Sequence, residues 1–169
     1  MSEKTTLDKS ATQTKPVTGS KFVYVTYIKT TQQKLWDALI KPEFTRQYWF
    51  GSYQECDWSV GASWKLMLPD VGCIDSGEVL SIDAPNKLVL SWQNHKLPER
   101  EAEGFSTATF LLEPTGELIK LTVIHEMAVD NSKLIEAVSN GWPAVLSSLQ
   151  SLLETGKAHP GTDTFKPCA

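Results

Sequence analysis

The hydrophobic pattern of the first fifty residues predicts one strand followed by two short helices. Residues 21–29 (KFVYVTYIK) are rich in β-branched and aromatic side chains, which favour a strand. In the segment TTQQKLWDALI the apolar residues then recur at helical spacing, with Thr30 as the expected N-cap and Gln33 as its capping-box partner. Pro42 ends this helix and begins the next one, PEFTRQYWF, because its fixed φ suits a first helical turn.

Between residues 53 and 127 the pattern changes to short runs that are separated by turn signals. The runs are YQECDW, SWKLML, GEVLSI, NKLVLSW, STATFLLE and LIKLTVIHEM. The segments PDVG, APNK and PTGE separate several of them, as hairpin connections do, so that with the first strand we predict an antiparallel sheet of six or seven strands. Alternation gives this sheet an apolar face that needs a cover. The residues expected on that face include Leu88, Leu90, Trp92, Ile119, Leu121, Val123 and His125.

The last hydrophobic segment has the spacing of one long amphipathic helix, with Asp130 as the expected N-cap. Its apolar stripe consists of Ile135, Val138, Trp142, Val145, Leu149 and Leu152, widened by Leu134, Leu146 and Leu153. The stripe continues in phase through Gly141 and Pro143. Because Pro143 has no N–H to donate to the carbonyl of Ser139, we expect the helix to kink or break there while both halves cover the sheet.

Composition separates the ends of the chain from this domain. Residues 1–20 are rich in Thr, Ser and Lys, which predicts a disordered N-terminal tail. Residues 156–169 contain two prolines and two glycines and are predicted to be a flexible C-terminal tail, so the domain comprises residues 21–155. The net charge is −4 and the 16 basic residues are scattered, which excludes the charge pattern of a nucleic-acid partner. The sequence has neither a signal peptide nor an apolar run of membrane-spanning length, which predicts a cytoplasmic protein.

Candidate chemistry is sparse. The three cysteines and three histidines are far apart in sequence and form no metal-binding spacing, so no metal or other cofactor is predicted. The sequence contains no G-x-S-x-G, no phosphate-binding glycine loop and no H-E-x-x-H. These patterns favour a binding protein over an enzyme, although an enzyme that acts mainly through the shape of a dry pocket stays open.

The order of these segments resembles that of a known family. A strand is followed by TTQQKLWDAL and KPEFTRQYWFG, then by DWSVGASWKL, SGEVLSIDAPNKLVLSW, FLLEPTGELIKLTVIHE and NGWPAVLSSLQSLLE. In this order, over roughly residues 21–155, the chain resembles the activator of heat-shock protein 90 ATPase homologue family, within the START-related and Bet v 1-like superfamily. The resemblance implies an α+β helix-grip fold: a curved antiparallel sheet around a long C-terminal helix, with two short helices after the first strand and a cavity between sheet and helix.

The implied cavity makes a set of inward-facing side chains candidate ligand contacts. They are Trp64, Leu66, Leu90, Trp92, Phe110, Leu112, His125, Trp142 and Leu146. The tryptophans would supply apolar area and an N–H group, but each alone is equally typical of a core. His125 is either a polar group for a ligand or, as we favour, a core histidine satisfied by its neighbours. Residues 48–50 (YWF) close the cavity mouth, form a partner-binding patch or, as we favour, pack the second helix on the sheet. Glu78 is expected on the solvated face.

Three functions follow from the resemblance, because the superfamily includes lipid and hormone binders, a chaperone co-factor, and polyketide cyclases and aromatases. Fold alone does not choose among them. Binding of a small hydrophobic molecule ranks first. Binding to heat-shock protein 90 with stimulation of its ATPase is the alternative, ranked second because the eukaryotic co-chaperone carries a separate N-terminal domain and only a short polar segment precedes residue 21 here. A polyketide cyclase or aromatase ranks third.

Overall fold

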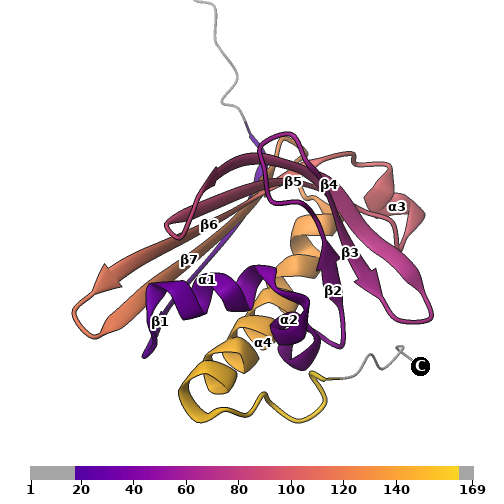
Figure 1. The fold of residues 1–169 in the computed structure, drawn as a ribbon. Helices are drawn as coiled ribbons and strands as arrows, with labels where there is room; N and C mark the ends of the chain where they lie inside the picture. Colours follow the sequence, from indigo (N-terminus) through magenta and orange to yellow (C-terminus); the bar gives the residue numbers. More distant parts are fainter. Residues whose placement is uncertain (1–17, 164–169) are drawn as a thin grey trace, which may run out of the picture.

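In the computed structural model, which describes residues 18–163, a seven-stranded antiparallel sheet curves around one long helix (Figure 1). The strands are β1 (Ser20–Ile28), β2 (Tyr53–Glu55), β3 (Ser63–Leu68), β4 (Gly72–Asp83), β5 (Lys87–Asn94), β6 (Ser106–Thr115) and β7 (Leu118–Met127). They lie in the order β1-β7-β6-β5-β4-β3-β2. The helices are α1 (Gln32–Ile40), α2 (Pro42–Tyr48), α3 (Pro98–Glu101) and α4 (Lys133–Thr155). The predicted helix-grip α+β fold is confirmed.

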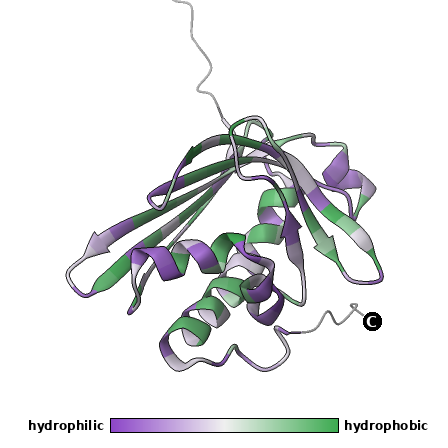
Figure 2. Cartoon of the chain, in the orientation of Figure 1, coloured by the Kyte–Doolittle hydropathy of each residue, from purple (hydrophilic) through white to green (hydrophobic). Residues whose placement is uncertain are grey.

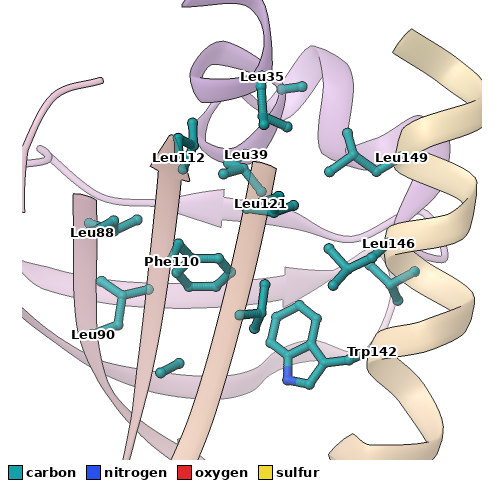
Figure 3. Close-up of a cluster of buried hydrophobic side chains, with 14 of the residues drawn as sticks. Leu35, Leu39, Leu88, Leu90, Phe110, Leu112, Leu121, Trp142, Leu146 and Leu149 are labelled. Carbon is teal, nitrogen blue, oxygen red and sulfur yellow. The ribbon is translucent and has the colours of Figure 1, made fainter. Parts of the chain in front are cut away.

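The core lies between the concave face of the sheet and α4, with α1 and α2 at one end (Figure 1). Hydrophobic residues recur along α4 and along the strands that curve around it (Figure 2). In the close-up, Trp142, Leu146 and Leu149 of α4 point toward the sheet (Figure 3). Alternation identified the inward faces correctly, since all seven residues expected there on β5 and β7 are buried.

Pro143 does not break the last helix. Helix α4 runs without interruption from Lys133 to Thr155, with Pro143 inside it, so the expectation of a break is wrong. The residues buried on both sides of the proline explain this, among them Ile135, Trp142 and Leu149. Fully burying one large apolar side chain stabilises by roughly 1.5–3 kcal/mol, so a few of them offset the roughly 3 kcal/mol that an interior proline costs.

Replacing both Gly141 and Pro143 with alanine is expected to raise the free energy of unfolding by at least about 1 kcal/mol, because alanine is the better helix former at both positions. A methyl group at Gly141 meets no atom within 4 Å, so the larger side chain causes no clash. Chemical denaturation measures the gain. The exposed Ala144 offers the reverse control, Ala144→Gly, which should cost about 1 kcal/mol. A double variant less stable than the wild type would show that the packing of α4 requires these two residues.

Two helix starts differ from the prediction by one or two positions. The N-cap of α1 is Thr31, whose side chain accepts a hydrogen bond from the backbone N–H of Lys34, and not Thr30. Gln33 bonds to Asp37 and so does not complete a capping box. The N-cap of α4 is Ser132 instead of Asp130. Each start contains neighbouring residues able to cap, and the path of the backbone selects one of them.

The segment after α4 is anchored to the helix as far as the structure describes it. Gly156 ends α4 in the left-handed conformation (φ 78°). The chain then turns back, and the hydroxyl of Ser148 bonds to the hydroxyl of Thr162 (2.7 Å) and accepts from the backbone N–H of His159 (2.9 Å). Residues 156–163 of the predicted C-terminal tail therefore lie against α4, whereas residues 1–17 and 164–169 lie outside the described part.

Within residues 18–163, none of the helices is long and apolar enough to cross a membrane.

Candidate functional site

A cavity of about 210 Å³ lies between the first half of α4 and strands β3, β4 and β5. Its helix side consists of Leu134, Ala137, Val138, Gly141, Trp142 and Val145. Its sheet side consists of Leu66, Leu68, Ile74, Asp75, Trp92 and Asn94. These walls are mostly apolar, and the indole rings of Trp92 and Trp142, which contact each other edge to face, form part of them. A space with such walls can accommodate a small apolar molecule.

One end of this cavity is polar. Lys96 is exposed and Arg100 is half-buried, so this end lies at the protein surface. Behind them Asp75 is 6% exposed, and its Oδ1 accepts a hydrogen bond of 2.6 Å from the amide of Asn94. Burial raises the pKa of Asp75 to about 6, although the hydrogen bonds from Asn94 and Trp92 partly oppose the shift. The carboxyl group therefore changes its charge just below neutral pH, on the wall of the cavity.

The turn between α2 and β2 forms the remaining wall, with Trp49, Phe50 and Ser52. Phe50 has a φ of 51°, a conformation that costs energy for a residue with a side chain. Its backbone N–H donates to the carbonyl of Thr162 at 2.6 Å, and Thr162 is itself bonded to α4. The C-terminal segment thus holds the turn in place. Residues 48–50 divide between two of their three interpretations: Tyr48 is core, with no exposed surface, whereas Trp49 and Phe50 border the cavity.

His125 is a core histidine with both ring nitrogens satisfied. The indole N–H of Trp142 donates to Nδ1 (3.2 Å), so Nε2 carries the proton and donates to the hydroxyl of Ser106 (2.8 Å). That hydroxyl donates in turn to the backbone carbonyl of Trp92 (2.9 Å). Burial lowers the pKa of His125 to about 4, so the ring is neutral near pH 7. The network joins α4 to the sheet, and His125 is not among the residues that line the cavity.

The nine candidate contacts are all buried, but they divide into three groups. Three of them line the cavity: Leu66, Trp92 and Trp142. Trp64, Leu90 and Phe110, again with Trp92, surround a second, much smaller space of about 10 Å³, which we call the inner void. Leu112, His125 and Leu146 line neither space. The cavity therefore lies nearer to the first half of α4 than the predicted contacts do.

Sequence reasoning missed the polar end of the cavity. Asp75 lies in a stretch, VGCIDSGEV, whose apolar residues do not alternate regularly, so its inward direction was not visible. A register shift in the pairing of β3 with β4 lies between Leu66 and Met67, opposite Asp75 and Cys73. Glu78, in contrast, is exposed as expected. The short helix α3, which carries Arg100, was also missed, because PERE follows no apolar period.

Three further residues, Ser76, His95 and Glu101, are linked by hydrogen bonds in the sequence hydroxyl, imidazole, carboxylate that a hydrolase triad has. The hydroxyl of Ser76 lies 2.7 Å from Nε2 of His95, and Nδ1 of His95 lies 2.8 Å from a carboxylate oxygen of Glu101. Ser76 follows the inward-facing Asp75 and so points to the opposite face of the sheet. None of the three lines the cavity, and Glu101 is half exposed. Their hydrogen bonds link α3 to β4 through His95, the residue that follows β5.

Among residues 18–163, histidine, cysteine and carboxylate side chains do not gather in any group of three or more that could hold a metal ion.

Comparison with known families gives one match that spans most of the chain. The family model described as "Activator of Hsp90 ATPase homolog 1-like protein" matches residues 29–154. The match begins at the end of β1 and ends at the last residues of α4, so it contains every residue that lines the cavity. No curated protein matches the chain significantly.

Solved structures share the fold at low sequence identity. A protein from Mesorhizobium loti is 24% identical, with a TM-score of 0.68, covering 80% of this chain and 97% of its own. An HSP90 activator from Plasmodium falciparum is also 24% identical, with a TM-score of 0.63 and coverages of 79% and 95%. CalU16 from Micromonospora echinospora is 18% identical, with a TM-score of 0.66 and coverages of 85% and 80%. At these identities the likeness establishes the fold alone.

Proposed function

The chain belongs to the family of Activator of Hsp90 ATPase homolog 1-like proteins, as its sequence indicated, and on this premise we propose that it binds a small, largely apolar molecule between its sheet and α4. The observation that carries the proposal is the cavity of about 210 Å³, with largely apolar walls that include indole rings and with one polar end. Trp92 of β5 and Trp142 of α4 contact each other edge to face, with ring centroids 5.8 Å apart, and so form one continuous aromatic wall.

The charges at the polar end favour a ligand with a polar group at that end. An apolar molecule in contact with Leu66, Trp92 and Trp142 gains about 25 cal/mol for each Å² of apolar surface that leaves water. A polar group beside Lys96 and Arg100 keeps contact with solvent, so its desolvation cost is small. The apolar walls thus provide affinity, and the polar end sets the orientation of the ligand.

Thermal denaturation in the presence of lipid and aromatic compounds tests this function. A compound present at a hundred times its Kd should add about 2.7 kcal/mol to the stability of the folded protein, which is a clear rise in Tm. Organic extraction of protein purified from its native host should yield the natural ligand for mass spectrometry. If extraction yields nothing and no compound changes the Tm, the proposal is wrong.

Gly141 supplies a matched pair of variants for this screen. It lines the cavity, and a Cβ atom there meets no other atom within 4 Å. Gly141→Leu extends a side chain from this position on the cavity wall, whereas Gly141→Ala adds only a methyl group. Both favour the helix, so both should fold. We expect Gly141→Leu to abolish the rise in Tm and Gly141→Ala to retain most of it. Equal rises in the two variants would place the ligand elsewhere.

Family membership supports a second candidate function, stimulation of the ATPase of heat-shock protein 90. The family takes its name from this activity, and the Plasmodium falciparum structure is that of an HSP90 activator. Titration of the protein into the chaperone of the same organism separates the two functions. Ligand binding predicts unchanged ATP turnover, while an increase that saturates and persists in Gly141→Leu would favour the chaperone partner.

A further inference from the structure

Two buried polar atoms have no hydrogen-bond partner within the described part of the chain, namely Oε1 of Gln54 and Nε1 of Trp64. Gln54 is 7% exposed and Trp64 is completely buried. The Gln54 amide nitrogen donates to the carbonyl of Leu39 at 2.8 Å, which fixes the direction of the amide and leaves Oε1 as the unused acceptor. Buried polar groups are nearly always paired, so this acceptor and this donor require an explanation.

Both side chains line the inner void. Its other walls are Leu39, Trp49, Leu88, Leu90, Trp92 and Phe110, all apolar apart from the two indole N–H groups. The volume of about 10 Å³ is close to the minimum of roughly 10–15 Å³ that one water-sized group needs. The inner void therefore has room for one small polar group, next to the two residues that carry the unpaired donor and the unpaired acceptor.

The inner void adjoins the ligand cavity. Trp49 and Trp92 line both spaces, and their rings lie nearly parallel with centroids 6.2 Å apart. Trp92 is buried on a central strand, whereas Trp49 is half-buried at the C-cap of α2. Trp49 is the less buried of the two rings, so its rotation would join the two spaces.

We propose that the inner void receives a hydroxyl group of the bound molecule, which accepts a hydrogen bond from Nε1 of Trp64 and donates one to Oε1 of Gln54. The proposal rests on the ligand-binding function above. A hydroxyl fits because it both donates and accepts. A carbonyl would leave Gln54 unpaired, and a carboxylate would bring a charge into an apolar enclosure that holds no cation. The ligand class is therefore an apolar, ring-containing alcohol or phenol.

Two probes of the same shape test the proposal directly. The hydroxyl of 2-naphthol occupies the place of the methyl group in 2-methylnaphthalene, so apolar contacts are nearly equal and only the hydrogen bonds differ. We expect 2-naphthol to bind the wild-type protein at least about fivefold more tightly by isothermal titration calorimetry. In the NMR spectrum, the indole N–H signal that disappears in Trp64→Phe should move downfield with 2-naphthol and stay unchanged with 2-methylnaphthalene.

Variants assign the preference to the two atoms. Gln54→Met removes the acceptor and Trp64→Phe removes the donor, and each should reduce the preference for 2-naphthol to about twofold or less. Trp36→Phe is the matched control, because Trp36 is also a buried tryptophan but lines neither space. It should keep the full preference. The wild-type comparison needs no variant, so the test stands even if a variant fails to fold.

The outcomes separate this inference from the function on which it rests. Equal affinities of the two probes for the wild-type protein would overturn the hydroxyl site, with the inner void then holding only water, and would leave ligand binding intact. A preference that persists in both Gln54→Met and Trp64→Phe would also overturn it. Binding of neither probe, together with a negative compound screen, would overturn both proposals.

Discussion

Replacement of Trp142 with alanine is expected to lower the free energy of unfolding by about 3 to 5 kcal/mol, the amount typical of a large aromatic side chain in a core. Trp142 is 4% exposed. Its ring lies among the rings of Trp49, Trp92, Phe110 and His125, with centroids 5.2 to 6.2 Å away. The loss therefore removes contacts on several sides, although one side of the ring borders the cavity.

Trp142→Phe separates the hydrogen bond from the packing. Phenylalanine retains a large ring but cannot donate to Nδ1 of His125, which would become an unpaired buried acceptor. That change alone should cost about 1 to 3 kcal/mol. Urea denaturation of the wild type and both variants measures the two contributions. If Trp142→Ala loses less than about 1 kcal/mol, the ring is mainly a cavity wall and not part of the close-packed core.

Stability should depend on pH through two buried groups that act in opposite directions. Asp75 has a pKa of about 6 in the folded protein, against 3.8 ordinarily, so the folded state binds the proton more tightly than the unfolded state does. Protonated Asp75 therefore stabilises the fold at low pH, and this stabilisation is lost as the pH rises from about 4 to 6. His125 has a pKa of about 4 in the folded protein, against 6.5 ordinarily, so the folded state favours the neutral ring. Neutral His125 therefore stabilises the fold above pH 6.5, and this stabilisation is lost as the pH falls to about 4. Each group changes the free energy of unfolding by about 3 kcal/mol over its range, and in the wild type the two opposite changes largely cancel.

Asp75→Asn should reveal the pH dependence of stability that His125 causes. The variant keeps the oxygen that accepts from Asn94 and loses the titration. Its stability relative to the wild type should therefore rise by about 3 kcal/mol between pH 4 and 6.5, as measured by urea denaturation across that range. His125→Gln should show the reverse trend, with relative stability falling as the pH rises. Parallel pH curves for Asp75→Asn and the wild type would mean that the carboxyl group does not titrate in this range.

Part of the candidate site was predictable because it depends on regular spacing. Trp92 lies on a strand that alternates clearly, and Trp142 lies on a helical stripe, so both were expected on the inner surface and both line the cavity. Asp75 was not predictable. Its inward direction depends on the irregular pairing of β4, and its raised pKa depends on burial by residues far away in sequence. The anchoring of Phe50 by Thr162 joins segments more than a hundred residues apart, which no local pattern encodes.

The sequence by itself determined the strand and helix periods, the inward faces of β5 and β7, the long amphipathic helix and the family. These properties follow from side-chain spacing along a backbone with fixed repeats of two and 3.6 residues. Only the tertiary structure decided the continuity of α4 through Pro143, the choice of Thr31 and Ser132 as caps, and the neutral state of His125. Each of these depends on burial and on hydrogen bonds with segments that are distant in sequence, and such contacts form only when the chain folds.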